Sequence, residues 1–320
     1  MPSVQEEFLR LKKYMNENIV GQEELINRLL IALLANGHLL VEGAPGLAKT
    51  KSIKMLSRAI DCSTVRIQFT PDLLPADITG SEVYRPQTGE FFFQKGPLFH
   101  NLVLVDEINR SPAKVQSALL EAMGESQITV GGKTYPLPDL FLVLATQNPI
   151  EQEGTYPLPE AQLDRFLMYV KINSPSIQAE RMILKLVRQE ELKQSLPIFE
   201  KISQETVMRA RKEVLNVDLS DELQEYIVQF IMATRGPAPY GKDLDGVVVY
   251  GSSPRGTIAL DICSRARAWL EGRTYVSPQD VRSVLHDVLR HRILLSFEAQ
   301  AEGWTQDKVI DELIERVPLP

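Results

Sequence analysis

Residues 38–50, which read HLLVEGAPGLAKT, constrain the fold of this 320-residue chain more than any other stretch. An apolar run of strand character ends at Glu42, and a turn rich in glycine and proline then leads into a segment with helical spacing. Such a turn directs several backbone N–H groups at one anion, and the helix N-terminus adds a partial positive charge. In this context Lys49 reaches nucleotide phosphates and the Thr50 hydroxyl binds Mg²⁺. The stretch therefore predicts a strand, a phosphate-binding loop and a helix.

The predicted phosphate loop departs from the usual pattern at one position. Its residues are Gly43, Ala44, Pro45, Gly46, Leu47, Ala48, Lys49 and Thr50. Ala48 stands where a second glycine is usual. Because alanine is the smallest side chain after glycine, we expect Ala48 to fit a helical first turn and not a strained backbone. An ordinary strand–turn–helix connection with a surface lysine is the alternative interpretation.

Polar side chains follow two further apolar runs, at the points where buried strands are predicted to end. Asp106 and Glu107 come after residues 102–105, and Asn148 comes shortly after residues 141–145. Ligands of open α/β sheets bind at the carboxyl ends of the strands. We expect Asp106 to hold Mg²⁺ together with Thr50, and Glu107 to polarise the attacking water. Asn148 is a candidate for orienting that water, although an Asn-Pro pair also opens turns.

Two arginines lie at predicted element boundaries further along the chain. Arg165 precedes the last predicted strand, residues 166–172, and by itself is equally a surface charge. Arg255 follows Ser-Ser-Pro at a predicted helix start. Because helix starts disfavour cations, Arg255 weakly indicates an anionic partner.

The order of the predicted elements indicates an α/β fold. Strands alternating with helices predict a three-layer αβα parallel sheet, and the segments after Asn173–Ser176 are interpreted as helices. We therefore expect a nucleotide-binding domain over residues 1–175 and a smaller all-helical domain over residues 176–320. Two hairpins are predicted, one over residues 83–91 and one around Gly131-Gly132. Phe91–Phe93 on the first hairpin either pack internally or face a partner or a pore.

Composition excludes several classes of protein. The chain has 35 basic and 42 acidic residues, a net charge of −7, which argues against binding to nucleic acid or to a membrane surface. No apolar run approaches membrane-spanning length and the first residues are polar, so we expect no membrane insertion and a cytoplasmic location. Cys62 and Cys263 match no metal or redox spacing and are expected to be reduced thiols. His286 and His291 lack the spacing of a two-histidine metal site and are interpreted as surface or packing residues.

Taken together, these stretches resemble the AAA+ ATPases, and within them the MoxR family, over nearly the whole chain. The resemblance rests on EGAPGLAKT (42–50), VDEINR (105–110), LLEAM (119–123), ATQNP (145–149), PLPEAQLDRF (157–166) and GSSPR (251–255), in this order. The phosphate loop with Ala48 is similar to that family's own version.

The resemblance also implies roles for individual residues. Asn148 would be the first sensor, and Arg255 the second sensor, which reaches the nucleotide from a helical lid. Arg165 would be an arginine finger that acts on ATP bound by the neighbouring subunit, and Val20 and Gly21 would line the adenine pocket. The Tyr84–Phe93 hairpin is similar to the family's helix-2 insert, and the Gly131-Gly132 hairpin to the insert that precedes the first sensor.

The resemblance implies Mg²⁺-dependent ATP hydrolysis in a homo-oligomeric ring, hexameric in this superfamily. Such proteins resemble chaperones that mature or assemble a protein partner, often one with a von Willebrand factor A domain. Three alternatives stay open: the motor subunit of a metal-chelatase-like complex, a nucleic-acid-dependent motor, and a small-molecule kinase with the same phosphate loop. A chelatase requires a large catalytic partner, and a nucleic-acid motor requires the basic, aromatic-interleaved groove that the sequence does not display.

Overall fold

The structure, a computed structural model, describes residues 3–149, 154–191, 199–236, 240–241 and 244–320. The first part of the chain contains α1 (Val4–Asn18), α2 (Glu23–Leu34), β1 (Leu39–Glu42), α3 (Lys49–Ala59), β2 (Thr64–Gln68), α4 (Pro75–Thr79), β3 (Gly80–Arg85), β4 (Glu90–Lys95), η1 (Pro97–Phe99), β5 (Leu102–Asp106), η2 (Ile108–Arg110), α5 (Ala113–Glu125), β6 (Gln127–Val130), β7 (Lys133–Pro136), β8 (Leu142–Gln147), α6 (Glu160–Leu163) and β9 (Met168–Lys171). The second part contains α7 (Ile177–Glu191), α8 (Gln204–Leu215), α9 (Asp221–Arg235), β10 (Val248–Tyr250), α10 (Pro254–Leu270), α11 (Pro278–Leu289), β11 (Leu294–Leu295), α12 (Phe297–Ala301) and α13 (Gln306–Arg316).

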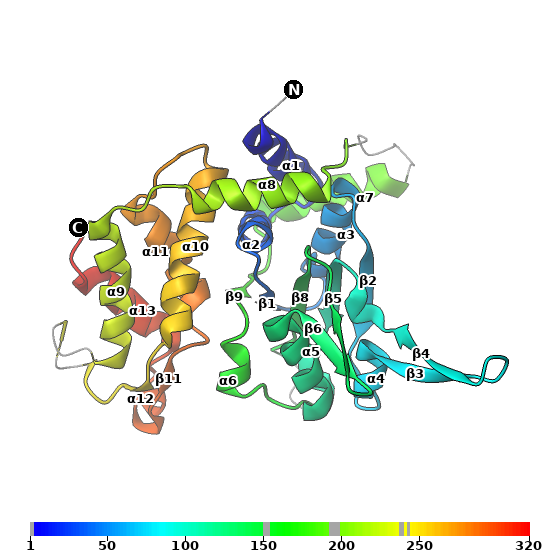
Figure 1. The fold of residues 1–320 in the computed structure, drawn as a ribbon. Helices are drawn as coiled ribbons and strands as arrows, with labels where there is room; N and C mark the ends of the chain where they lie inside the picture. Colours follow the sequence, from blue (N-terminus) through cyan, green and yellow to red (C-terminus); the bar gives the residue numbers. More distant parts are fainter. Residues whose placement is uncertain (1–2, 150–153, 192–198, 237–239, 242–243) are drawn as a thin grey trace.

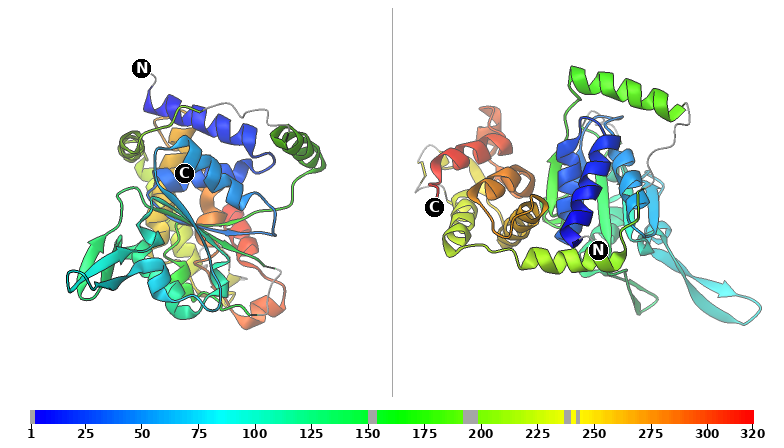
Figure 2. Two further views of the ribbon diagram at one scale, coloured as in Figure 1. Left: turned by 90° about the vertical axis from the view of Figure 1, so that its right-hand side faces the viewer. Right: turned by 90° about the horizontal axis from the view of Figure 1, so that it is seen from above.

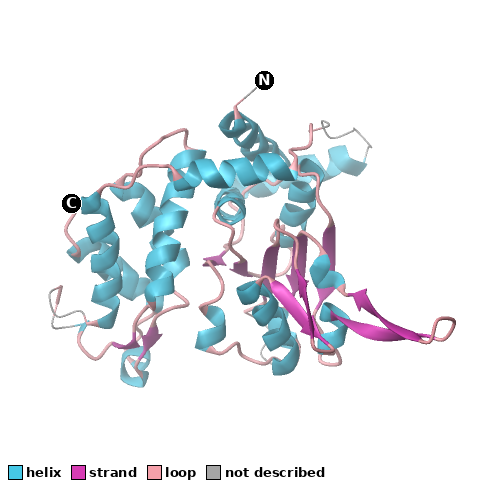
Figure 3. Ribbon diagram, in the orientation of Figure 1, coloured by secondary structure: helices cyan, strands magenta, loops and turns pink. Residues whose placement is uncertain are grey.

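A parallel sheet organises the first part of the chain (Figure 1). Within the described residues its strand order is β2-β5-β8-β1-β9, and every neighbouring pair is parallel. The central strands are buried on both faces, as their continuous apolar runs predict. Figure 3 shows this sheet in magenta with helices packed around it. The predicted three-layer α/β domain is therefore confirmed.

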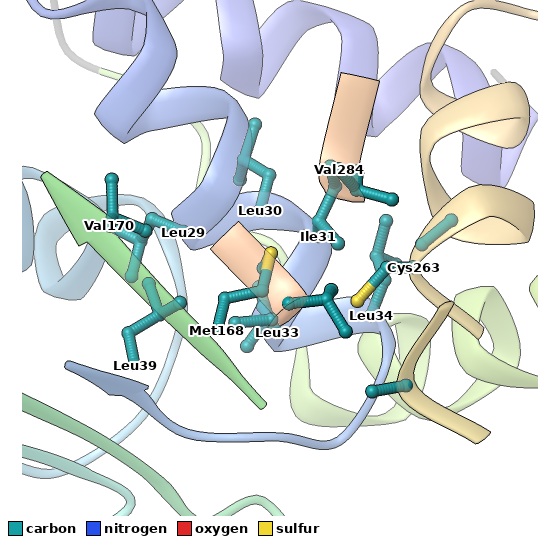
Figure 4. Close-up of a cluster of buried hydrophobic side chains, with 14 of the residues drawn as sticks. Leu29, Leu30, Ile31, Leu33, Leu34, Leu39, Met168, Val170, Cys263 and Val284 are labelled. Atoms are coloured by element: carbon teal, nitrogen blue, oxygen red, sulfur yellow. The ribbon is translucent and has the colours of Figure 1, made fainter. Parts of the chain in front are cut away.

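Helix α2 lies between the sheet and the second part of the chain. All but a few of its side chains are buried, because leucine and isoleucine occupy both of its faces. Figure 4 shows Leu29 and Leu33 of α2 among Leu39 and Met168 of the sheet, and Leu34 close to Cys263 of α10. These residues belong to one continuous hydrophobic core that also includes the buried face of α11. The two parts of the chain therefore share apolar packing and do not meet at a polar contact alone.

The second part is helical, as predicted, and α8 runs along the top of the molecule between the sheet domain and the other helices (Figure 1). Helix α11 begins as its sequence indicates, with a Ser277–Asp280 capping box and a proline in the first turn. The structure adds the antiparallel pair β10–β11, which the sequence analysis did not predict. A strand of two residues gives no alternating pattern that periodicity can detect. The division of the chain at residues 175 and 176 stays a prediction.

The two predicted hairpins are present and touch each other. The β3–β4 hairpin projects from the body (Figure 2), and the aromatic run of β4 is divided between two environments. Phe91 and Phe92 are exposed, whereas the Phe93 ring stacks on Tyr135 of β7 with centroids 4.1 Å apart. Gly131 in the β6–β7 turn lies so close to the Glu82 carboxylate that a Cβ would come within 2.5 Å of it. Part of the run thus packs internally and part is free to meet a partner.

The cysteines are free thiols, and the two histidines are packing or surface residues, as the sequence indicated. Both thiols are free, and burial raises the pKa of Cys62 to about 11 and of Cys263 to about 12. His291 is buried against the Phe166 carbonyl, and His286 contacts Asp311. Among the described residues, no group of three or more His, Cys, Asp or Glu side chains is arranged to hold a metal ion. A search of the same residues finds no helix with the length and apolar content that a membrane crossing needs.

A buried ion network ties α2 to α11. The Arg28 guanidinium donates to the Asp287 carboxylate at 2.5 Å and to the Ser283 carbonyl at 2.6 Å. Arg290 donates to the other oxygen of Asp287, also at 2.6 Å. Buried charges are tolerated only when they are paired and hydrogen-bonded. The network therefore holds the helical part in a fixed position on the sheet domain.

Removing the central carboxylate of this network is expected to be strongly destabilising. Asp287→Ala removes the buried carboxylate that Arg28 and Arg290 share, and we expect a loss of about 3–5 kcal/mol in the free energy of unfolding, measured by urea denaturation. Glu17→Ala, which breaks the exposed Lys13–Glu17 pair, is the control and should cost far less. Similar small losses in both variants would contradict the structural role of the network.

Candidate active site

The phosphate loop runs from the end of β1 to the start of α3. Gly46 has a φ of 85°, a conformation that favours glycine. Gly43 lies directly against Ile172, the residue that follows β9, because a Cβ at this position would come within 2.3 Å of Ile172 Cγ1. The Lys49 ammonium reaches back across the loop and donates to the Gly43 carbonyl at 2.6 Å. The loop is thus closed around its own lysine, with the N-terminus of α3 next to it.

The backbone of Ala48 contradicts the sequence expectation. We expected a helical conformation without strain, but Ala48 has φ 60° and ψ 14° and precedes the first helical residue. A left-handed alanine costs about 1–2 kcal/mol because Cβ approaches the following carbonyl oxygen. The loop therefore keeps the geometry that a glycine would give it, and the alanine makes that geometry strained.

The two acidic residues lie at the end of β5, as predicted, and Thr146 of β8 contacts the carboxylate of one and the backbone of the other. The Thr146 hydroxyl donates to Asp106 Oδ1 at 3.4 Å and accepts from the Glu107 backbone N–H at 3.0 Å. Arg66 of β2 donates to Asp106 Oδ2 at 2.6 Å. Glu107 itself has φ 58° and ψ 53°, a second strained residue in the site. This conformation turns the chain sharply just after the strand and separates the directions of the two carboxylates.

The Glu107 side chain has two partners that the sequence analysis missed. Gln68 Nε2 donates to Glu107 Oε2 at 2.7 Å, and Arg110 lies 3.3 Å from the same oxygen. Gln68 is opposite Asp106 in the register of β2 with β5. Nothing in a single sequence says which strand neighbours β5, so no signal along the chain marked Gln68 or Arg66. Both side chains restrain a carboxylate that is expected to act on water.

Asn148 and Lys49 complete the group at this edge of the sheet. Asn148 is buried directly beyond β8, which pairs with β5 on one side and with β1 on the other. Burial lowers the pKa of Lys49, and the carboxylates of Asp106, Glu107 and Glu42 partly offset that decrease. The structure therefore brings Lys49, Asp106, Glu107 and Asn148 together at the carboxyl ends of adjacent strands.

Val20 and Gly21 line a cavity of about 420 Å³ beside the phosphate loop. The cavity is also lined by Ile172, the residue that contacts Gly43, and by Ala179 of α7. Gln22 Nε2 donates to the Asn173 carbonyl at 3.3 Å, and this bond connects the segment that contains Val20 and Gly21 to the segment after β9. The predicted adenine-pocket residues thus lie where a base attached to a loop-bound phosphate has room to bind.

The residues predicted to bind Mg²⁺ fit that role by their chemistry. Thr50 lies in the first turn of α3, which packs against β5, and Asp106 ends β5. Mg²⁺ is held by oxygen ligands and usually keeps several waters together with phosphate oxygens. The Thr50 hydroxyl and the Asp106 carboxylate provide such a partial ligand set, and Thr146 and Arg66 fix the position of the carboxylate.

Arg165 and Arg255 lie at the opposite edge of the sheet. Arg165 follows Asp164, which precedes β9. Arg255 Nη1 is 3.9 Å from the Asp164 carboxylate, and Arg292 donates to that carboxylate at 2.8 Å. The Leu167 N–H donates to the carbonyl of His38, which precedes β1, so this group is at the amino ends of the strands. At about 3.3 Å per residue, the four residues of β9 alone separate the two edges by roughly 13 Å. The structure therefore does not bring either arginine to the phosphate loop of the same chain.

Comparisons with known proteins agree with this architecture. Residues 38–168 match the family model described as the ATPase family associated with various cellular activities (AAA), and residues 246–313 match the AAA lid domain. The chain is 45% identical to the chaperone MoxR1 of Mycobacterium tuberculosis over 305 residues, covering 94% of this chain and 79% of that protein. It is 43% identical to YeaC of Bacillus subtilis over 309 residues, covering 96% of this chain and 93% of that protein. A solved structure from Cytophaga hutchinsonii has a TM-score of 0.91 at 44% identity, covering 99% of this chain and 96% of that one.

Relieving the strain at Ala48 is expected to stabilise the protein. Because glycine adopts φ 60° without a Cβ clash, Ala48→Gly should raise the free energy of unfolding by roughly 0.5–1 kcal/mol, measured by urea denaturation. Ala44, whose φ is not positive, is the matched control in the same loop, and Ala44→Gly should lower stability. Destabilisation by both exchanges would count against the strained conformation.

Variants of Lys49 and Glu107 should have different effects, the first on ATP binding and the second on ATP hydrolysis. Lys49→Ala is expected to weaken ATP binding because the loop loses its cation. Glu107→Gln should bind ATP normally and hydrolyse it about 10²–10⁴ times more slowly, because an amide is a poor general base. Binding is measured with a fluorescent ATP analogue and turnover by phosphate release. Normal turnover by Glu107→Gln would remove the role given to that carboxylate.

Proposed function

The chain belongs to the MoxR family of AAA ATPases, and we propose that it hydrolyses ATP with Mg²⁺ in a ring of identical subunits to remodel a protein partner. The observation that carries this proposal is the separation of two sets of groups on one sheet. The phosphate loop, Asp106, Glu107 and Asn148 lie at the carboxyl ends of the strands, and Arg165 and Arg255 lie at the amino ends.

The separation favours an active site that is shared between subunits. A head-to-tail contact brings two different edges of identical chains together, and repeated contacts of this kind close into a ring. In such a ring the arginines of one subunit face the nucleotide of the next. An arginine supplied in trans to a phosphoryl group increases the rate about 10³–10⁵-fold in related reactions. A single subunit is therefore expected to be nearly inactive.

The roles within one site follow from the geometry of its residues. The loop N–H groups and Lys49 hold the phosphates. To do so, the Lys49 ammonium exchanges its bond to the Gly43 carbonyl for a bond to a phosphate oxygen. Mg²⁺, held through Thr50 and Asp106, neutralises charge on the phosphates when it is bound. Glu107 accepts a proton from the attacking water, and Asn148 orients that water.

Arg165 and Arg255 are proposed to act together on the neighbouring site. Asp164 accepts from the Ser253 hydroxyl at 2.9 Å and pairs with Arg255, and both of these residues are at the start of α10. The carboxylate that pairs with the arginine of the lid thus belongs to the residue directly before Arg165 in the chain. The second-sensor role that the family resemblance gave to Arg255 is retained here for the neighbour's nucleotide.

Remodelling activity is proposed from the relatives and from the shape of the molecule. The most informative name among the relatives is that of the chaperone MoxR1. The projecting β3–β4 hairpin carries the exposed Phe91 and Phe92 and is a candidate for contact with a client or partner. A hexameric ring, a cytoplasmic location and a partner with a von Willebrand factor A domain belong to the same proposal.

The shared site predicts that activity depends on assembly. ATP turnover per subunit should rise with protein concentration until the ring is complete, because dilution removes the neighbour's arginine. Arg165→Ala should bind ATP with little loss and stay slow at every concentration. Phosphate release over a wide range of protein concentration measures both. Turnover that is already full in the dilute monomer would overturn the shared site and favour a self-sufficient kinase-like enzyme.

A further inference from the structure

One face of α5 forms a seat for the segment that carries Arg165. The Gln162 side chain donates to the Ser117 hydroxyl at 3.2 Å, and Arg165 Nη1 donates to the Leu120 carbonyl at 2.7 Å. Ser117, Leu120 and Gly124 follow one another at spacings of three and four residues, so they share one face of the helix. The guanidinium of Arg165 lies over the last of these positions.

Gly124 has no conformational reason to be glycine. Its φ is not positive, and the helix continues through it to Glu125. The left-handed residue that ends the helix is Ser126, with a φ of 51°. Glycine inside a helix is less stable than alanine at the same position. The chain therefore keeps a glycine here against its helical preference.

The Arg165 side chain, which lies next to Gly124, explains why this position is glycine. A Cβ at this position would come within 2.5 Å of Arg165 Nη1 and 3.3 Å of Arg165 Cζ. The atoms in its way are the far end of a flexible side chain and not backbone. A larger residue at position 124 is thus compatible with the fold, but it requires the guanidinium to move.

We propose that Gly124 is a positioning residue that holds Arg165 in the orientation required at the neighbouring subunit's nucleotide, an inference that rests on the proposed shared site. The seat uses one of the five N–H donors of the guanidinium in its bond to the Leu120 carbonyl. The remaining donors are available to a phosphate. A displacement of about 1 Å at a reacting group can lower a rate about 10²-fold.

The seat also relates the chain's own site, at Glu107, to the neighbouring site on which Arg165 is proposed to act. Helix α5 follows Glu107 after the short η2 turn, and Gly124 is near its other end. In the chain, Arg165 directly follows Asp164, whose carboxylate is bound by Arg292 and Ser253 of the helical part. The arginine proposed to act on the neighbour is therefore held by α5, the helix that follows the chain's own Glu107 and η2, and is next in the chain to a residue fixed by the lid.

The test uses mixed rings of full-length chains. A Glu107→Gln chain cannot hydrolyse its own ATP but supplies Arg165, and an Arg165→Ala chain has an intact site but supplies no arginine. Mixing the two should restore ATP turnover well above that of either variant alone. The same mixture with Glu107→Gln/Gly124→Ala as the arginine donor should show at least tenfold less restoration. Gly124→Leu, with a longer side chain, should reduce restoration further.

Controls separate position from stability. Gly124→Ala should melt at or above the temperature of the parent chain and bind ATP equally well, because alanine favours the helix. Glu107→Gln/Glu125→Ala, altered at the next, exposed position of α5, should restore turnover fully. Full restoration by the Gly124→Ala donor would overturn the positioning role and leave the shared site intact. No restoration by the Glu107→Gln donor itself would overturn the shared site.

Discussion

The parallel pairing of β1 with β8 and β9 determines where each functional group of this chain lies. In a parallel sheet all carboxyl ends meet at one edge, so the phosphate loop after β1 and Asn148 after β8 become neighbours. β5, on the other side of β8, adds Asp106 and Glu107 to the same edge. The same rule places the residues that precede β9 at the other edge, with Arg165 among them. The shared site that we propose takes its two sets of groups from these two edges.

The site stores strain in two residues, Ala48 and Glu107. Both have left-handed backbone conformations that side chains other than glycine rarely adopt, and each costs of order 1–3 kcal/mol. They persist because the residues around them are fixed: Ala48 lies between the loop and α3, and the Glu107 N–H is held by Thr146. The two strained residues thus stand at the two places where the chain leaves a strand at the candidate site, before α3 and directly after β5. The apolar strands below supply the stability that offsets the strain.

The helical lid is joined to the sheet domain by packing and by charge. The core runs without interruption from α2 into α10 and α11, and the Arg28–Asp287 pair crosses the same junction. A further pair, Lys171 with Asp307, connects the end of β9 to α13 at 3.2 Å. Of these contacts, the shared core and the buried Arg28–Asp287 pair are the costly ones to break. In the proposed ring, the lid also carries Arg255 toward the neighbouring subunit, so adjacent sites become mechanically dependent on one another.

The sequence by itself determined most of the elements of this protein and the candidate residues of its site. Local patterns were sufficient because a buried strand, a phosphate loop and a capped helix each depend on nearby residues: Leu102–Val105 before Asp106, Gly43–Thr50, and Ser277 with Asp280. The conformation of Ala48 was predicted wrongly: it is left-handed in a loop that also packs against Ile172, a residue distant in sequence, and no local pattern marks that backbone angle. Only the tertiary structure decided which groups meet. Strand order set Gln68 and Arg66 against the carboxylates, and the packing of α6 on α5 set Arg165 over Gly124, since both depend on contacts between segments that no local pattern encodes.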